Sequence, residues 1–208
     1  MTKKRSKSSQ RWMKEHFDDE YVLKAQKLGY RSRAVFKLDE IQQKDKIIKQ
    51  DMTIVDLGAA PGGWCQYARK ILGQSGRVVG LDILPIDDLA DVELIQGDFR
   101  EDNVLEQLIE VVQGKPVDLV LSDMAPNITG VSSVDQPGSI YLCELALDFA
   151  QQVLKPGGDC LVKVFQGEGY DELVKSFREH FQKIIFRKPK ASRARSREVY
   201  ILARGYNL

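Results

Sequence analysis

The sequence predicts an α/β fold, in which a mostly parallel sheet of seven strands is covered by helices on both faces. The first observation is that short apolar runs alternate with helix-like segments from residue 53 onwards. The second is a glycine-rich turn between the first run and the helix after it, at residues 58–63. The third is that no helical segment separates the runs at 182–187 and 198–204. We therefore expect one antiparallel strand at one edge of the sheet.

Two helical segments are expected before the sheet begins. They lie near Asp19–Lys27 and Ala34–Lys44, and Gly29 separates them. In the second segment apolar residues such as Val35 and Leu38 recur on one face, which is the spacing of an amphipathic helix.

The strands are expected where several residues rich in valine, isoleucine and leucine follow one another. These runs are Thr53–Leu57, Arg77–Asp82, Val92–Gln96, Val117–Ser122, Asp159–Phe165, Gln182–Arg187 and Glu198–Arg204. The helices between them are expected at Trp64–Leu72, Glu101–Val112, Ile140–Val153 and Tyr170–Glu179. The stretch Leu154-Lys-Pro-Gly-Gly158 predicts a helix stop followed by a turn.

Length and composition predict one domain over residues 19–208, preceded by a basic, flexible segment at 1–18. No run approaches the roughly 18 apolar residues of a membrane span, and no apolar stretch follows the basic start as in a secretory signal. The three cysteines are odd in number and far apart, so we expect reduced thiols in a cytoplasmic protein. Neither His16 nor His180 has a second metal ligand at a useful spacing, so no metal site is expected.

The net charge of +1 hides a strong asymmetry along the chain. Residues 1–37 and 183–208 each carry +7, whereas residues 38–182 carry −13. Two basic ends on an acidic body favour a nucleic-acid partner, although charged ends also aid solubility. The expected RNA contacts are Lys3, Lys4, Arg5, Lys7, Arg11, Arg31, Arg33, Arg187, Lys188, Lys190, Arg193, Arg195 and Arg197. Tyr21, Tyr30 and Tyr200 are candidates for base stacking, although core packing is the simpler explanation for each.

The glycine-rich turn predicts a ligand at the end of the first strand. A dinucleotide fingerprint reads G-x-G-x-x-G, and the matching positions here are Gly58, Ala60 and Gly63. The missing middle glycine is the one that lets a backbone approach a pyrophosphate. We therefore expect a smaller ligand without phosphates, such as an adenosine with an amino-acid tail, held by Gly58, Pro61, Gly62, Gly63 and Trp64.

Acidic residues follow the other strands at the edge where such a ligand binds. Asp82 is expected to accept hydrogen bonds from ribose hydroxyls, and Asp98 to accept one from the adenine amino group. Ile83 and Phe99 are expected to line the base. For Asp98 a helix N-cap remains the alternative. Asp56 either holds the glycine loop or meets the amino group of the ligand.

Five motifs, taken together, resemble one family. They are Ser32-Arg-Ala-Val-Phe-Lys-Leu38, Asp56-Leu-Gly-Ala-Ala-Pro-Gly-Gly-Trp64, Ser122-Asp-Met-Ala-Pro126, Val162-Lys-Val-Phe165 and Arg195-Ser-Arg-Glu-Val-Tyr200. In this order they resemble the FtsJ family of ribose 2′-O-methyltransferases, which have the Rossmann-like fold of class I S-adenosylmethionine-dependent methyltransferases. The resemblance spans residues 32–200, almost the whole chain.

The resemblance implies a catalytic tetrad of Lys37, Asp123, Lys163 and Glu198. It implies that S-adenosylmethionine is the methyl donor and S-adenosylhomocysteine the product, with Asp123 also near the sulfonium. The implied substrate is a uridine of 23S ribosomal RNA, on the assembled 50S subunit, and the enzyme is expected to be a monomer. The alternative within the family is another RNA, such as a transfer RNA anticodon loop or an mRNA cap.

A ribose hydroxyl is a very weak acid, so its attack on a methyl group needs a proton acceptor or an orienting cation. Lysine accepts a proton only when its pKa falls from about 10.4 towards neutrality. A neighbouring cation and partial burial favour this, so Lys163 beside Lys37 is the expected acceptor, with orientation by a charged ammonium as the alternative. For Lys37 alone an ordinary surface ion pair is an equal alternative, whereas Lys163 interrupts an apolar strand.

Two other function classes are weighed against this one. Asp123-Met-Ala-Pro126 lacks the aromatic residue that follows the Asn/Asp-Pro-Pro motif of base-nitrogen methyltransferases, which favours a ribose hydroxyl. A nicotinamide-dependent oxidoreductase is disfavoured by the missing glycine. A non-catalytic RNA-binding module is disfavoured by the intact tetrad, and it predicts that Lys163→Ala leaves cellular function unchanged.

Overall fold

The computed structural model describes residues 19–127, 129–193 and 196–207. The basic segment predicted at 1–18 lies outside these residues. Helix α2 follows an aspartate cap, since the Asp19 carboxylate accepts a hydrogen bond from the backbone N–H of Tyr21 at 3.0 Å. The described helices are α2 (Glu20–Lys27), α3 (Val35–Asp45), α4 (Gly63–Leu72), α5 (Asp102–Val112), α6 (Ser132–Val153) and α7 (Tyr170–His180). None of them combines the length and apolar character that crossing a membrane requires.

The described strands form one seven-stranded sheet in the order β3-β2-β1-β4-β5-β7-β6. They are β1 (Thr53–Leu57), β2 (Arg77–Asp82), β3 (Glu93–Gln96), β4 (Val117–Ser122), β5 (Leu154–Phe165), β6 (Phe181–Arg187) and β7 (Glu198–Tyr206). The predicted antiparallel pair at one edge is confirmed: β6 is the edge strand, and β7 runs antiparallel to both of its neighbours. The other pairs are parallel.

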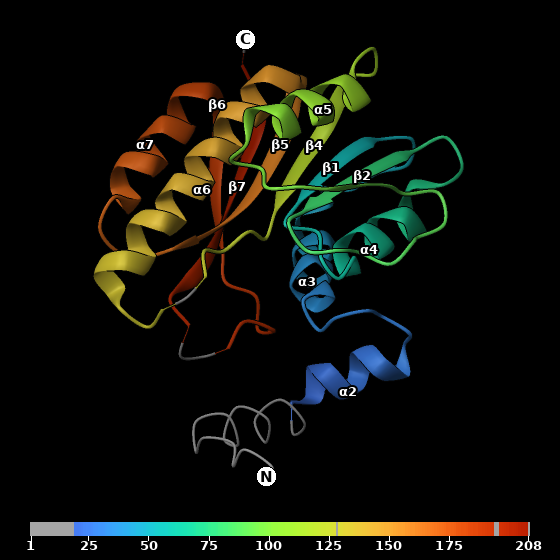
Figure 1. Cartoon of the computed structure of the whole chain (residues 1–208), viewed down its shortest axis with the longest axis horizontal. Coiled ribbons are helices and arrows are strands. Elements are labelled where there is room, and N and C mark those ends of the chain that lie inside the picture. Colours follow the sequence, from blue (N-terminus) through green and yellow to red (C-terminus); the bar gives the residue numbers. More distant parts are fainter. Residues whose placement is uncertain (1–18, 128, 194–195, 208) are drawn as a thin grey trace.

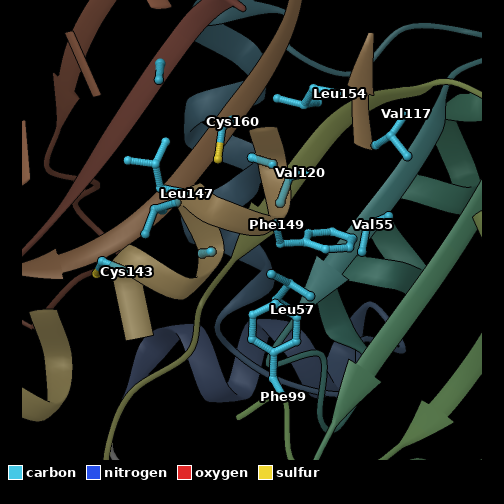
Figure 2. Close-up of a cluster of buried hydrophobic side chains, with 14 of the residues drawn as sticks. Val55, Leu57, Phe99, Val117, Val120, Cys143, Leu147, Phe149, Leu154 and Cys160 are labelled. Atoms are coloured by element: carbon cyan, nitrogen blue, oxygen red, sulfur yellow. The ribbon is translucent and has the colours of Figure 1, made fainter. Parts of the chain in front are cut away.

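Helices cover both faces of the sheet, as predicted. Helices α5, α6 and α7 lie on one face, and α3 and α4 lie on the other (Figure 1). Because side chains alternate along a strand, β1 sends Val55 and Leu57 to the first face and Ile54 to the second. The first core holds Phe149 of α6 among residues of β1 and β4 (Figure 2). The sheet is therefore fixed from both sides, which holds its carboxyl edge in place.

Two element boundaries differ from the sequence prediction. Helix α6 begins at Ser132 rather than near residue 140, so it includes Pro137. Proline removes one helical hydrogen bond, but Gln136 beside it anchors this turn, because its Nε2 donates to the carbonyls of Phe165 and Glu168 at 3.0 Å each.

Strand β5 begins at Leu154 rather than at residue 159. Leu154 pairs with Val117, whereas Asp159 pairs with Leu119, so the register shifts and residues 155–158 are irregular within the strand. The proline and glycines that predicted a turn therefore occupy this irregularity.

Candidate active site

A cavity of about 500 Å³ opens at the carboxyl ends of β1, β2, β3 and β4. This volume lies in the range of small-molecule sites. Six predicted residues line it: Gly58, Asp82, Ile83, Asp98, Phe99 and Asp123. The sequence prediction missed several further lining residues, among them Leu84, Arg100, Met124, Pro126, Tyr141 and Leu142. Met124 and Pro126 belong to the 123–126 motif, which stands out in the sequence. Tyr141 and Leu142 lie in a helical segment whose sequence gives no sign of ligand binding.

The first part of the glycine loop lies against the end of β4. Gly58 has a φ of +78°, and a Cβ placed there would meet the backbone nitrogen of Met124 at 2.9 Å. The backbone N–H of Asp123 in turn donates to the carbonyl of Leu57 at 3.1 Å. A glycine is therefore needed for the close approach that places Asp123 beside the cavity.

The second part of the loop, Pro61 to Trp64, does not line the cavity. Gly62 has a φ of +101° and is the N-cap of α4. The indole of Trp64 is buried, packs against Tyr200 at 5.9 Å between ring centroids, and donates to the carbonyl of Ala34 at 2.8 Å. The side chain of Trp64 thus joins the loop to the region before α3 and to β7.

Asp82 holds the glycine loop at the end of β2. Its carboxylate accepts hydrogen bonds from the backbone N–H groups of Ala60 and Leu84, each at 2.9 Å. Carboxylate oxygens have about four acceptor positions, so Asp82 still has room for hydroxyl donors from the cavity.

The residues expected around an adenine are divided between the cavity wall and the core. The N-cap of α5 is Glu101, not Asp98. The Asp98 carboxylate instead forms an ion pair with Arg100 at 2.5 Å, and the hydrogen bonds from Arg100 lower the pKa of Asp98. The ring of Phe99 packs into the core against Phe149 with a centroid distance of 5.7 Å (Figure 2). Ile83 is 57% exposed, so it offers an apolar surface to the cavity.

Asp56 is buried beneath the loop and does not line the cavity. The thiol of Cys65 donates to its Oδ2 at 3.1 Å. Burial raises the pKa of Asp56 to about 7; the Cys65 hydrogen bond opposes this, and the carboxylates of Asp123 and Asp82 add to it. Of the two roles predicted for Asp56, its position favours support of the loop.

Replacing Asp56 by asparagine is expected to stabilise the protein above pH 7. Because the folded-state pKa is raised, the wild type loses stability as pH rises from about 4, the unfolded value, through about 7. The shift corresponds to at most about 4 kcal/mol of unfolding free energy at pH 8, which the neutral amide would restore. Urea unfolding from pH 4 to pH 8 would measure this. The exposed Asp148→Asn is the control, and parallel curves for Asp56→Asn and the wild type would contradict the prediction.

Four residues predicted as a catalytic tetrad come from four elements and form two ion pairs. Lys37 of α3 pairs with Glu198 at the start of β7, with 2.8 Å between Nζ and Oε1. Lys163 of β5 pairs with Asp123 after β4, with 3.0 Å between Nζ and Oδ1, and it also donates to the Asp123 carbonyl. Lys37, Lys163 and Glu198 are each less than 9% exposed. Charges held so far from water require such partners.

Tyr200 links the two ion pairs. Its hydroxyl donates to the Asp123 carboxylate at 2.7 Å, and the Lys37 ammonium lies 5.8 Å from its ring centroid. The ring is fully buried, so core packing rather than base stacking explains this tyrosine.

The two carboxyls remain ionised in this cluster. Burial opposes ionisation of Asp123, but Lys163 and Lys37 outweigh it and hold the pKa of Asp123 below its usual value. In the same way burial would raise the pKa of Glu198, and Lys37 holds it below its usual value. The described tetrad is therefore two lysines matched by two carboxylates, one of which, Asp123, lines the cavity.

Several expected RNA contacts make other contacts within the chain. Arg31 donates to the carbonyls of Pro61, Asp87 and Asp88, so it ties the glycine loop to the segment after β2. Arg33 pairs with Asp19 at 2.9 Å. Two more cations are engaged: Arg187 pairs with Asp45, and Lys188 donates to the carbonyls of Ser196 and Glu198. Lys190 and Arg193 make contacts through their backbones, Lys190 with Glu40 and Arg193 with Ser196.

Other expected RNA contacts lie outside the described residues: Lys3, Lys4, Arg5, Lys7, Arg11 and Arg195. Arg197 is exposed and also makes an interaction. Among the described residues, no group of three or more histidine, cysteine, aspartate or glutamate side chains is placed to hold a metal ion.

Comparisons with known proteins identify the family of this chain. A sequence model of the FtsJ-like methyltransferase family matches residues 30–206. Relatives from the Corby and Paris strains of Legionella pneumophila, both named ribosomal RNA large subunit methyltransferase E, are 62% identical over 204 residues, which is 98% of this chain and 99% of theirs. A Plasmodium falciparum structure, described as a candidate ribosomal RNA methyltransferase, is 31% identical with a TM-score of 0.76, and the match covers 85% of this chain and 98% of that one.

Proposed function

Because the chain belongs to the FtsJ-like methyltransferase family, we propose that it transfers a methyl group from S-adenosylmethionine to a ribose 2′-oxygen of large-subunit ribosomal RNA. The observation that carries this proposal is the buried tetrad of Lys37, Asp123, Lys163 and Glu198, which meets the cavity through Asp123. The names of the Legionella pneumophila relatives support ribosomal RNA as the substrate. Within it, we propose a uridine of 23S RNA in the assembled 50S subunit.

The cavity suits S-adenosylmethionine by charge and by volume. Among the described residues, three carboxylates line it, those of Asp82, Asp98 and Asp123, and the one lining arginine is paired with Asp98. Such a wall attracts a ligand with sulfonium and ammonium charges and disfavours one that carries phosphates. Ile83 adds an apolar surface for a base. When bound, S-adenosylmethionine would supply an electrophilic methyl group.

Different residues would bind different parts of S-adenosylmethionine. Asp82 would receive the ribose hydroxyls, because its carboxylate lies at the end of β2 with acceptor capacity left after Ala60 and Leu84. Asp98 would receive the adenine amino group, and Asp123 would attract the sulfonium. The N-terminal turn of α4 lies outside the cavity lining, so the amino-acid tail would have to reach beyond the cavity for its carboxylate to meet the backbone N–H groups of Gly63 and Trp64. The N–H of Gly62 already donates to the carbonyl of Ala59 at 2.6 Å.

The tetrad would act on the RNA hydroxyl. Lys163 is placed to accept its proton or to orient it, because its ammonium is fixed by both the carboxylate and the carbonyl of Asp123. Lys37 and Glu198 would contact the same RNA hydroxyl from the side opposite Lys163. Methyl transfer is a single displacement, so alignment of the two reacting groups by these fixed side chains would contribute much of the rate.

Transfer of tritiated methyl groups tests the proposal. We expect the purified protein to label 50S subunits from cells that lack the enzyme, and mapping to place the label on a uridine ribose. Naked 23S RNA and transfer RNA are the parallel substrates, and labelling of transfer RNA alone would establish the alternative within the family. Labelling of a base, or of no RNA, would overturn the proposal. A cytoplasmic, monomeric state remains a prediction.

A further inference from the structure

A second cavity of about 500 Å³ lies on the outer side of α3, between α2 and the segment after β6. Its lining joins the two basic ends of the chain, because Lys24 comes from the first and Lys190 from the second. Lys44 of α3 is the third cation. Two aromatic residues, Tyr21 and Phe36, form part of the wall.

The acidic residues of this wall already have hydrogen-bond donors. The Glu40 carboxylate accepts the backbone N–H groups of Lys190 and Ala191 at 2.7 and 2.8 Å. The Asp39 carboxylate accepts the hydroxyl of Tyr67 at 2.8 Å and the amide of Gln43 at 3.0 Å. Both carboxylates are therefore committed to the fold, and Glu40 fixes the segment after β6 against α3.

The lysines are not committed in the same way. Lys24, Lys44 and Lys190 are exposed. Lys24 lies over the ring of Phe36 at 4.5 Å, and within the described part of the chain the ammonium groups of Lys44 and Lys190 form no ion pair. The arginines expected to bind RNA differ, since Arg31 and Arg33 make internal contacts. The cations available to an anionic ligand at this surface are thus lysines.

Helix α3 connects this cavity with the tetrad. Lys37 is the next residue after Phe36 and precedes Glu40 by three positions, so one helical turn carries a tetrad residue and the cavity wall. The Lys37 ammonium pairs with Glu198, whereas the Glu40 carboxylate accepts hydrogen bonds from the backbone at 190–191. Lys44 lies seven residues after Lys37, about 10 Å further along the helix axis. An RNA strand with one ribose at the tetrad would therefore carry its neighbouring nucleotides along α3 towards this cavity.

We propose that this cavity binds the phosphodiester backbone of the RNA substrate beside the methylated nucleotide, through Lys24, Lys44 and Lys190. The inference rests on the proposed function and extends it from the reacting ribose to the flanking RNA. Phosphate contacts by lysine position a substrate and do not read its sequence, so this surface would contribute affinity and salt dependence.

The double variant Lys44→Gln/Lys190→Gln tests the inference, because neither side chain holds another part of the fold. Lys115→Gln/Lys175→Gln is the matched control, with two exposed lysines outside this cavity. Binding of each protein to naked 23S RNA and to 50S subunits is measured from 50 to 200 mM salt. We expect the cavity variant to bind naked RNA roughly 10- to 30-fold more weakly at 0.1 M salt, with a log–log salt slope shallower by about 1.4. The control should match the wild type.

Unchanged affinity and slope in the cavity variant would overturn the inference. So would a loss confined to assembled subunits, which would indicate a ribosomal protein as the partner of this surface. The wild type separates this failure from that of the proposed function: if it labels a uridine ribose while the cavity variant binds RNA normally, only the inference fails.

Discussion

Replacing Lys163 by alanine is expected to reduce methyl transfer by roughly 10²–10⁴-fold, the usual contribution of a proton-transfer group. The reason is that its ammonium, fixed by Asp123, is the tetrad cation on β5 next to the cavity. Cofactor affinity should persist, because Lys163 does not line the cavity. Single-turnover labelling of RNA measures the first effect, and titration calorimetry with S-adenosylmethionine measures the second. Loss of cofactor binding with the fold intact would contradict the role assigned to Lys163.

Two further variants sharpen this experiment. Lys155→Ala is the matched control, since Lys155 lies on the same strand and also pairs with an aspartate, Asp118, outside the site. It should leave transfer unchanged. Lys163→Arg separates the two roles of Lys163, because a guanidinium orients a hydroxyl but does not accept its proton. An inactive Lys163→Arg favours proton acceptance, whereas partial recovery favours orientation.

Replacing Gly58 by alanine is expected to lower the unfolding free energy by roughly 2–4 kcal/mol. One part of this cost is the backbone conformation, since φ is +78°. The other is the close approach of Met124, whose Cγ, N and Cα lie 2.8, 2.9 and 3.0 Å from the added Cβ. Two of these atoms belong to the backbone, so the segment that carries Asp123 must shift. Methyl transfer should fall as well.

Gly114→Ala isolates the conformational part of that cost. Gly114 has the same φ of +78°, and nothing lies within 4 Å of its added Cβ, so only about 1 kcal/mol is expected there. Urea unfolding of both variants gives the difference that is due to Met124. Equal losses in the two variants would show that the approach of Met124 to Gly58 does not constrain the site.

The sheet could be predicted from the sequence because its strands are apolar runs separated by clear helix signals. The two wrong boundaries share a cause: proline and glycine predict an interruption, and here they are tolerated. Pro137 stays within α6, where Gln136 anchors the turn to residues after β5. Residues 155–158 remain in β5 as an irregularity opposite β4. Both depend on tertiary contacts that a local pattern does not contain.

The site could be predicted only in part, for a related reason. Residues at the ends of strands converge by topology, so Asp82, Asp98 and Asp123 were found on the cavity wall. Whether a side chain faces the cavity, the core or another segment depends on packing. Phe99 therefore turned out to place its ring in the core, and Arg31 to bind three carbonyls. The second cavity is formed where α2, α3 and residue 190 come together, and no sequence motif predicted that these segments meet.

The antiparallel course of β7 makes the sheet and the tetrad depend on the same segment of the chain. Because β7 runs against its neighbours, its first residue, Glu198, reaches the edge at which β1 and β4 end. Strand β6 comes earlier in the chain, yet its pairing partner in the sheet is β7. Without residues 198–206 the chain would still hold Lys37, Asp123 and Lys163, but β6 would lack its pairing partner and Lys37 would lack Glu198. The same nine residues therefore complete both the sheet and the tetrad.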